Sequence, residues 1–126
     1  MKKTKEVAPY SDGTLADRFA KEQRNDLRYD AAQRRWYIRE GRQWNDAGKE
    51  ALLVLRRVAE FMQVITAERA LELPYGEDLR FNRELIGLGS YRKIRAVLNQ
   101  ARWTRPLLIT AANPLPNSAA KTRRAR

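Results

Sequence analysis

Residues 27–44, LRYDAAQRRWYIREGRQW, decide the fold of this chain, because aromatic side chains gather here around two turn signals. The first signal is Asp30, whose carboxylate can accept a hydrogen bond from its own downstream backbone. The second is Gly41, which can adopt the positive φ of a tight hairpin. The stretch therefore predicts three short strands in an antiparallel meander, over residues 27–29, 34–39 and 42–44.

The middle strand alternates in a period of two, which is typical of a half-buried strand. Trp36 and Ile38 share one face, and Trp44 is expected to join them. The opposite face is expected to carry Arg35, Tyr37 and Arg39. So small a sheet is marginal in water unless its apolar face is covered. Helices must supply the cover, so we expect an α+β fold: a mostly helical single domain with a three-stranded antiparallel meander packed on helices.

Four helices are predicted around the meander, over residues 14–24, 47–69, 79–87 and 91–103. The first begins with the spacing of a capping box at Thr14–Asp17. The second follows Asn45–Asp46, which can cap it, and Glu50 in its first turn suits the helix dipole. Asp78 and Ser90 are expected to cap the third and the fourth.

The second helix carries a continuous apolar face. Its apolar residues recur at spacings of 4, 3, 4 and 3, at Ala51, Leu55, Val58, Met62 and Ile65. Val54 and Phe61 lie beside this line. Such a stripe is typical of a core helix, so we interpret it as the cover of the sheet.

The domain is expected to span residues 11–110. Residues 1–10 are interpreted as a polar, mobile lead, and residues 111–126, with their prolines and basic end, as a disordered basic tail. Leu107–Thr110, which precede that tail, are either one more strand or an apolar strap.

The composition excludes several kinds of chemistry. The 126 residues include no cysteine and no histidine, so a Cys nucleophile, a His base and a zinc site of the usual ligands are removed. The acidic residues are scattered, so we expect no metal site, no cofactor, no catalytic residue and no enzymatic activity. The chain has no apolar run of about eighteen residues, which predicts no membrane span. No secretory apolar region follows the basic N-terminus, which indicates a cytoplasmic protein.

The net charge of +11 is concentrated late in the chain. Residues 1–78 hold 15 Lys/Arg and 14 Asp/Glu, a net charge of +1. Residues 79–126 hold the other 11 Lys/Arg and one acid, Glu84, a net charge of +10. Only four of these 11 basic residues lie in the tail, so seven belong to the expected domain. This asymmetry predicts a polyanion as the partner of the second half.

A polar, basic stripe runs along the predicted helix 91–103 at Arg92, Arg95, Asn99 and Arg102. By helical geometry it lies about 130° from the apolar face of the helix. No acid lies on this helix. Because the arginine fork matches phosphate oxygens, the stripe predicts contact with a nucleic-acid backbone. The expected nucleic-acid-binding residues are Arg80, Arg83, Arg92, Lys93, Arg95, Asn99, Arg102 and Arg105.

Three further residues have two interpretations each. Arg34 and Arg35 either extend the basic patch or make the tip of a hairpin soluble. Trp103 either stacks on an unpaired base or packs at the end of its helix, which is the commoner role of a tryptophan there.

The order of these segments resembles the amino-terminal domain of phage and plasmid primase-helicases of the poxvirus type. The resemblance is carried by LRYDAAQRRWYIREGRQW at 27–44 and by LGSYRKIRAVLNQAR at 88–102, and it covers residues 11–110. In that family the domain lies between a primase module and a superfamily 3 helicase. The resemblance implies a short free-standing relative that associates with replicating DNA, without primase or helicase activity of its own.

The expected function is therefore that of a nucleic-acid-binding accessory module of phage-type DNA replication, with DNA favoured over RNA. Two alternatives stay open. A protein-interaction or helicase-collar module would use Leu52, Leu53 and the Leu107–Ile109 segment. A phage-encoded inhibitor of a host defence complex would use its basic face to compete for nucleic acid. Strand preference and oligomeric state are left open by the sequence.

Overall fold

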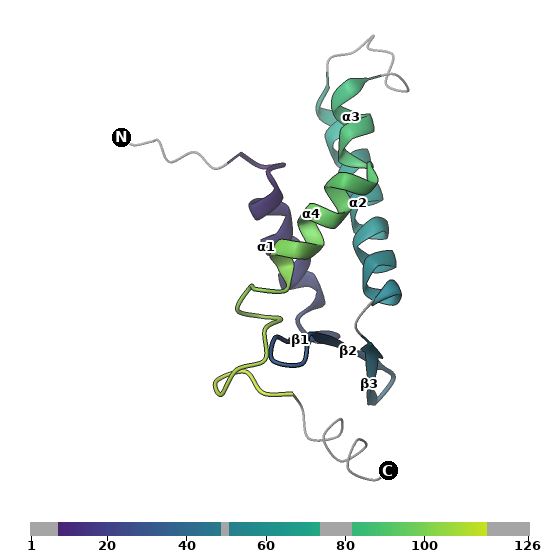
Figure 1. Cartoon of the computed structure of the whole chain (residues 1–126). Coiled ribbons are helices and arrows are strands. Elements are labelled where there is room, and N and C mark those ends of the chain that lie inside the picture. Colours follow the sequence, from purple (N-terminus) through teal and green to yellow (C-terminus); the bar gives the residue numbers. More distant parts are fainter. Residues whose placement is uncertain (1–7, 49–50, 74–81, 116–126) are drawn as a thin grey trace, which may run out of the picture.

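The computed structural model describes residues 8–48, 51–73 and 82–115. Within these ranges it is a small α+β domain of four helices and one three-stranded antiparallel sheet (Figure 1). In chain order the elements are α1 (Asp12–Gln23), β1 (Leu27–Asp30), β2 (Arg35–Glu40), β3 (Gln43–Gly48), α2 (Leu52–Glu72), α3 (Arg83–Leu88) and α4 (Tyr91–Ala101). The predicted fold class is confirmed.

The three longer helices form a bundle with the sheet at one end (Figure 1). α4 packs against both α1 and α2, and α3 lies at the far end of the bundle from the sheet. One face of the sheet joins the core of the bundle through Leu27, Tyr29, Trp36 and Ile38. This is the helical cover that so small a sheet requires.

The buried residues of the helices follow the predicted apolar faces closely. In α1 the stripe of Leu15 and Phe19 is fully buried, and Phe19 meets Phe61 of α2 with ring centroids 5.4 Å apart. The predicted face of α2 is confirmed at Val58, Met62 and Ile65, although its line is shifted slightly. The buried set of α2 is Val54, Val58, Phe61, Met62 and Ile65, while Leu55 is only half-buried.

The meander is confirmed, and both turn signals act as predicted. The carboxylate of Asp30 accepts a hydrogen bond from the backbone N–H of Gln33, at 3.2 Å. Arg34 completes that turn with a φ of 58°, and Gly41 takes a φ of 64° in the second hairpin. The strands lie in the order β1-β2-β3.

The prediction that Trp44 shares a face with Trp36 and Ile38 is wrong. The β2–β3 hairpin pairs Arg39 with Trp44, and paired residues point to the same face of a sheet. Trp44 therefore lies on the face of Tyr37, which was expected to be polar. Tyr37 is only 1% exposed and Trp44 only 5%, and they form a second apolar cluster. The partly buried residues Ile109 and Leu115 cover this cluster.

The start of the long helix is also later than predicted. Asn45 and Asp46 continue β3, where Asp46 pairs with Tyr37 across the ladder. The carboxylate of Asp46 accepts from Arg35 at 3.0 Å and from the backbone N–H of Gly48 at 2.7 Å. These bonds use Asp46 in the sheet, so it cannot cap a helix. α2 instead follows Ala51, whose φ is 52°; Glu50 lies outside the described residues.

The other helix ends show which caps were correct. Ser90 caps α4 as predicted, because its hydroxyl accepts from the N–H of Lys93. α1 begins at Asp12, earlier than predicted, and its cap is Ser11, whose hydroxyl accepts from the N–H of Thr14. α3 is capped by Asn82, whereas Asp78, the expected cap, lies outside the described residues.

The segment after α4 is a strap that holds the edge of β1. The N–H of Tyr29 donates to the carbonyl of Leu107 at 2.7 Å, and the N–H of Ile109 donates to the carbonyl of Tyr29 at 2.9 Å. The packed chain continues past residue 110, because the side-chain amide of Asn113 donates to three carbonyls, those of Arg105, Pro106 and Leu108. Residues 116–126 of the expected tail lie outside the described residues, as do residues 1–7.

An ion pair joins α1 to α2. Both guanidinium nitrogens of Arg18 donate to Glu68, at 3.0 and 3.1 Å, and the hydroxyl of Tyr10 donates to the same carboxylate at 3.2 Å. The Arg18 guanidinium, helped by Tyr10, holds the pKa of Glu68 below its ordinary value. Partial burial, together with the carboxylates of Glu72 and Glu68, raises the pKa of Tyr10 to about 12.

This pair predicts a loss of stability in acid. Because the pKa of Glu68 is lowered on folding, its contribution is present above the unfolded value of 4.5 and is lost as the pH falls through the folded value. The pair is about two-fifths exposed, so we expect Glu68→Gln to cost only about 0.5 kcal/mol at pH 7. The difference from wild type should shrink as the pH falls below 4.5 and vanish once the pH is well below the folded pKa of Glu68. Thermal unfolding across pH measures this, and Glu60→Gln, which removes an exposed carboxylate from the same helix, is the matched variant for comparison.

Candidate nucleic-acid interface

The predicted stripe of α4 is present as a surface. Arg92 and Asn99 are exposed, and Arg95 and Arg102 are half-buried on the same side of the helix. Among the described residues these arginines make no ion pair with an acid. The guanidinium of Arg102 donates to Asn99 at 3.1 Å and lies 5.0 Å from the ring centre of Tyr29. The charges of the stripe are therefore available to a ligand.

Arg95 and Arg102 line a groove of about 370 Å³ between α4 and the start of α2. The guanidinium of Arg95 lies 5.9 Å from the ring centre of Tyr91, which also lines the groove. The other described residues that line the groove are Trp36, Ala51, Leu52, Leu55 and Leu98, and no acid occurs among its described lining residues.

Lys93 lies on the other side of α4 from the stripe. Its ammonium group donates to the carboxylate of Asp12 at 2.6 Å and to the carbonyl of Tyr10 at 2.9 Å. It therefore ties α4 to the start of α1, and its charge is already balanced. This partner is 81 residues away in the sequence, which is why helical spacing alone did not reveal it. We leave Lys93 out of the interface.

The remaining predicted residues are spread over the molecule. Arg83 is exposed on α3, at the end of the bundle far from the sheet (Figure 1), and Arg80 lies outside the described residues. Arg34 is exposed at the tip of the first hairpin. Arg35 forms an ion pair with Asp46 within the sheet. Arg83, Arg34 and Arg35 therefore belong to other elements than the stripe of α4.

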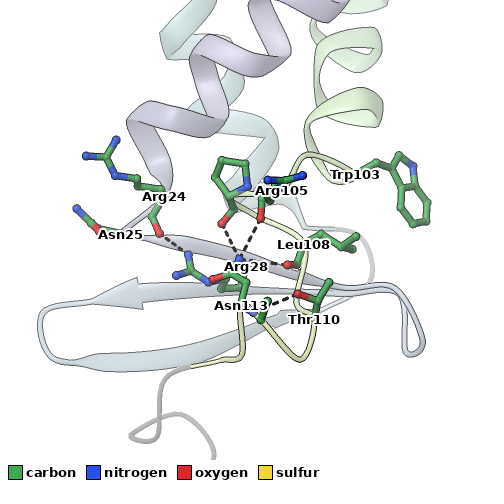
Figure 2. A pocket seen from close by; sticks show the side chains of 10 residues that line it. Arg24, Asn25, Arg28, Trp103, Arg105, Leu108, Thr110 and Asn113 are labelled. Atoms are coloured by element: carbon green, nitrogen blue, oxygen red, sulfur yellow. Dashed lines mark hydrogen bonds between the residues drawn. The ribbon is translucent and has the colours of Figure 1, made fainter.

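Arg105 and Trp103 instead line an open cleft of about 960 Å³, with the indole of Trp103 at the edge opposite Arg24 and pointing outward (Figure 2). The cleft, which we call the arginine cleft, lies where the end of α1, the strand β1 and the strap come together. Within the described parts of the chain its lining contains three arginines and no acidic residue: Arg24, Asn25, Arg28, Trp103, Arg105, Pro106, Leu108, Thr110, Ala112 and Asn113. The cleft therefore combines positive charge with apolar surface.

The three arginines of the cleft are held differently. Arg28 donates to the carbonyls of Arg24 and Leu27 and lies 5.5 Å from the ring centre of Trp44. Arg28 thus satisfies the carboxyl end of α1, where a cation also suits the helix dipole. Burial lowers the pKa of Arg28, yet an arginine stays charged at neutral pH. Arg24 and Arg105 are exposed, and the side chain of Arg105 makes no hydrogen bond within the described parts of the chain.

Trp103 is 58% exposed, so it does not pack in the core. Its ring meets the ring of Tyr29 nearly at a right angle, with ring centroids 5.8 Å apart and planes at 78°. Tyr29 also contacts the guanidinium of Arg102. Through this one tyrosine the arginine cleft adjoins the groove of Arg95 and Arg102.

Sequence reasoning missed Arg24 and Arg28. Both belong to the part of the chain whose net charge is almost zero, so the charge asymmetry directed attention elsewhere. Their position around the end of the first helix was a usable signal, because basic side chains there often bind the last carbonyls. Nothing local indicated that Arg105 would lie beside them, since the cleft exists only when the strap folds back on β1.

Comparison of the chain with family models, with curated proteins and with solved structures gave no match. Within the described ranges no group of three metal-binding acidic side chains occurs. No helix in those ranges is both long enough and apolar enough to cross a bilayer. The inference about function therefore depends on the charged surfaces described above.

Proposed function

We propose that this protein is a nucleic-acid-binding accessory module that holds a phosphate backbone on the arginine cleft and the neighbouring stripe of α4. The observation that carries the proposal is that the described residues lining the cleft and the adjoining groove include arginines and no acid. By contrast, a cavity between α1 and α2 is lined by three acids, Glu22, Asp26 and Glu60, and by one arginine, Arg57.

Arginine is the residue type that this task favours. Its planar fork binds phosphate oxygens in pairs and is weakly hydrated, so less is lost when water is displaced. Contacts of this kind position a protein on nucleic acid without reading its sequence. The role in phage-type DNA replication rests on the sequence resemblance alone, and we propose DNA as the first polymer to test.

The salt dependence of binding tests the proposal. If about five phosphates are contacted, the log-log slope of affinity against salt should be near −4 to −5 for duplex DNA. Between about 50 and 200 mM salt the affinity should then fall roughly 500-fold. Fluorescence anisotropy with labelled single-stranded and duplex DNA measures this. Binding that is undetectable at low salt, or insensitive to salt, would remove the proposal.

A protein-interaction or collar role is the second candidate. It is favoured by Leu52 and Leu53 at the start of α2, which are 68% and 46% exposed. The Leu107–Ile109 segment is not available for it, because Leu107 is fully buried and the segment holds β1. Light scattering over a range of protein concentrations tests this role, and a monomer at every concentration would count against self-assembly.

A further inference from the structure

We infer that the arginine cleft takes single-stranded nucleic acid, with one unpaired base stacked on the indole of Trp103 and the flanking phosphates on Arg24 and Arg105. The inference rests on the proposed function and narrows its ligand to one structural class.

The exposed indole of Trp103 is available for stacking by a ligand. The chain has three tryptophans, and two of them are buried, with 1% of Trp36 and 5% of Trp44 exposed. Trp103 keeps 58% of its surface exposed and lines the cleft. A large aromatic ring at the mouth of a basic cleft is the arrangement on which unpaired bases stack.

The exposed indole of Trp103 is held on one side by the buried ring of Tyr29. Tyr29 is 3% exposed and fixed in the core, between the indole of Trp36 at 5.0 Å and the guanidinium of Arg102 at 5.0 Å. Trp103 meets this fixed ring nearly at a right angle, which is a favourable geometry for two aromatic rings. The contact covers one part of the indole and leaves the rest open to a ligand.

Stacking on Trp103 favours single-stranded nucleic acid over a duplex. In a duplex the faces of the bases are already stacked on one another, so an indole reaches one only after a base has been extruded from the duplex, which is unfavourable. The cleft also has apolar lining residues, Pro106, Leu108 and Ala112. Apolar surface suits contact with unstacked bases, whereas the outside of a duplex presents charged phosphates. Phosphates on either side of the stacked base would meet the two exposed arginines of the cleft, Arg24 and Arg105.

Intrinsic tryptophan fluorescence makes the inference measurable on the whole chain. Because Trp36 and Trp44 are buried, a stacking ligand should quench the emission of Trp103 alone. We expect a twelve-residue thymidine oligonucleotide (a length of the order of one such site) to quench part of the emission and to bind more tightly than a duplex of equal length. Thymidine monophosphate should bind far more weakly, since it lacks flanking phosphates.

Two substitutions complete the test. Trp103→Ala should weaken single-strand binding roughly 5- to 100-fold, the loss expected for one stacked base, and should change duplex binding less than about 2-fold. Trp103→Phe should restore most of the single-strand affinity in anisotropy while the emission is no longer quenched. Circular dichroism checks that both variants are folded; since the side chain is exposed, both should be.

The outcomes separate this inference from the proposed function. Three results would each overturn the single-strand assignment and leave the proposed function standing. They are saturated binding without quenching, an equal loss of affinity of Trp103→Ala for single-stranded and for duplex DNA, and binding of thymidine monophosphate as tight as that of the oligonucleotide. If neither single-stranded nor duplex DNA binds at low salt, the single-strand assignment and the proposed function are both wrong.

Discussion

Reversing the charge of Arg24 and Arg105 together is expected to weaken DNA binding by about 100-fold or more at moderate salt. A hydrogen bond to a charged group contributes about 1.5–3 kcal/mol, so two lost phosphate contacts alone correspond to roughly 100-fold to 10,000-fold. The two glutamates would in addition repel the backbone. Both side chains are exposed, so Arg24→Glu with Arg105→Glu should leave the fold intact. Anisotropy against one labelled oligonucleotide measures the effect.

A matched control distinguishes the cleft from a diffuse effect of net charge. Arg42→Glu with Arg56→Glu makes the same change in charge at two exposed positions, which line neither the cleft nor the groove. At about 0.15 M salt, charges more than about 8 Å apart are largely screened, so this variant should bind within a few-fold of wild type. Equal losses in the two variants would contradict a localised site.

The stripe of α4 can be weighed separately in the same assay. Arg92→Glu with Arg95→Glu should also reduce the affinity, if the bound strand continues from the cleft along the groove. An unchanged affinity would confine the interface to the arginine cleft.

Trp36→Ala should cost about 3–5 kcal/mol of the free energy of unfolding, the usual range for a buried tryptophan. Trp36 is 1% exposed in the central strand β2 and packs on Tyr29, so its removal opens a cavity where the sheet meets the helices. A domain of this size is stabilised by only about 5–15 kcal/mol, so the variant should lose a large share of its stability and unfold at a clearly lower temperature than wild type.

Guanidinium denaturation followed by far-ultraviolet circular dichroism measures this cost without relying on tryptophan emission. Trp103→Ala is the matched control, because it removes the same side chain from an exposed position, and its cost should stay below about 1 kcal/mol. Similar costs for the two variants would mean that the core is not built around the sheet. Trp44→Ala, which tests the second apolar cluster, should fall between them.

Part of the candidate site could be predicted from the sequence. The spacing of Arg92, Arg95 and Arg102 placed them on one side of a helix, because helical periodicity is a local property. Trp103 and Arg105 were also identified, although not the cleft that contains them. Arg24 and Arg28 were not identified, since their relevance depends on the strap that returns to β1 after α4.

The sequence by itself determined the elements: the meander, its turns at Asp30 and Gly41, the helices and most of their buried faces. These features follow from backbone preferences and side-chain periodicity over a few residues. Only the tertiary structure decided that Trp44 is buried on the far face of the sheet, that Asp12 balances the charge of Lys93 and that the strap forms one wall of the arginine cleft. These outcomes depend on which distant segments pack together, and such contacts are selected by burial and charge across the whole fold rather than by any local pattern.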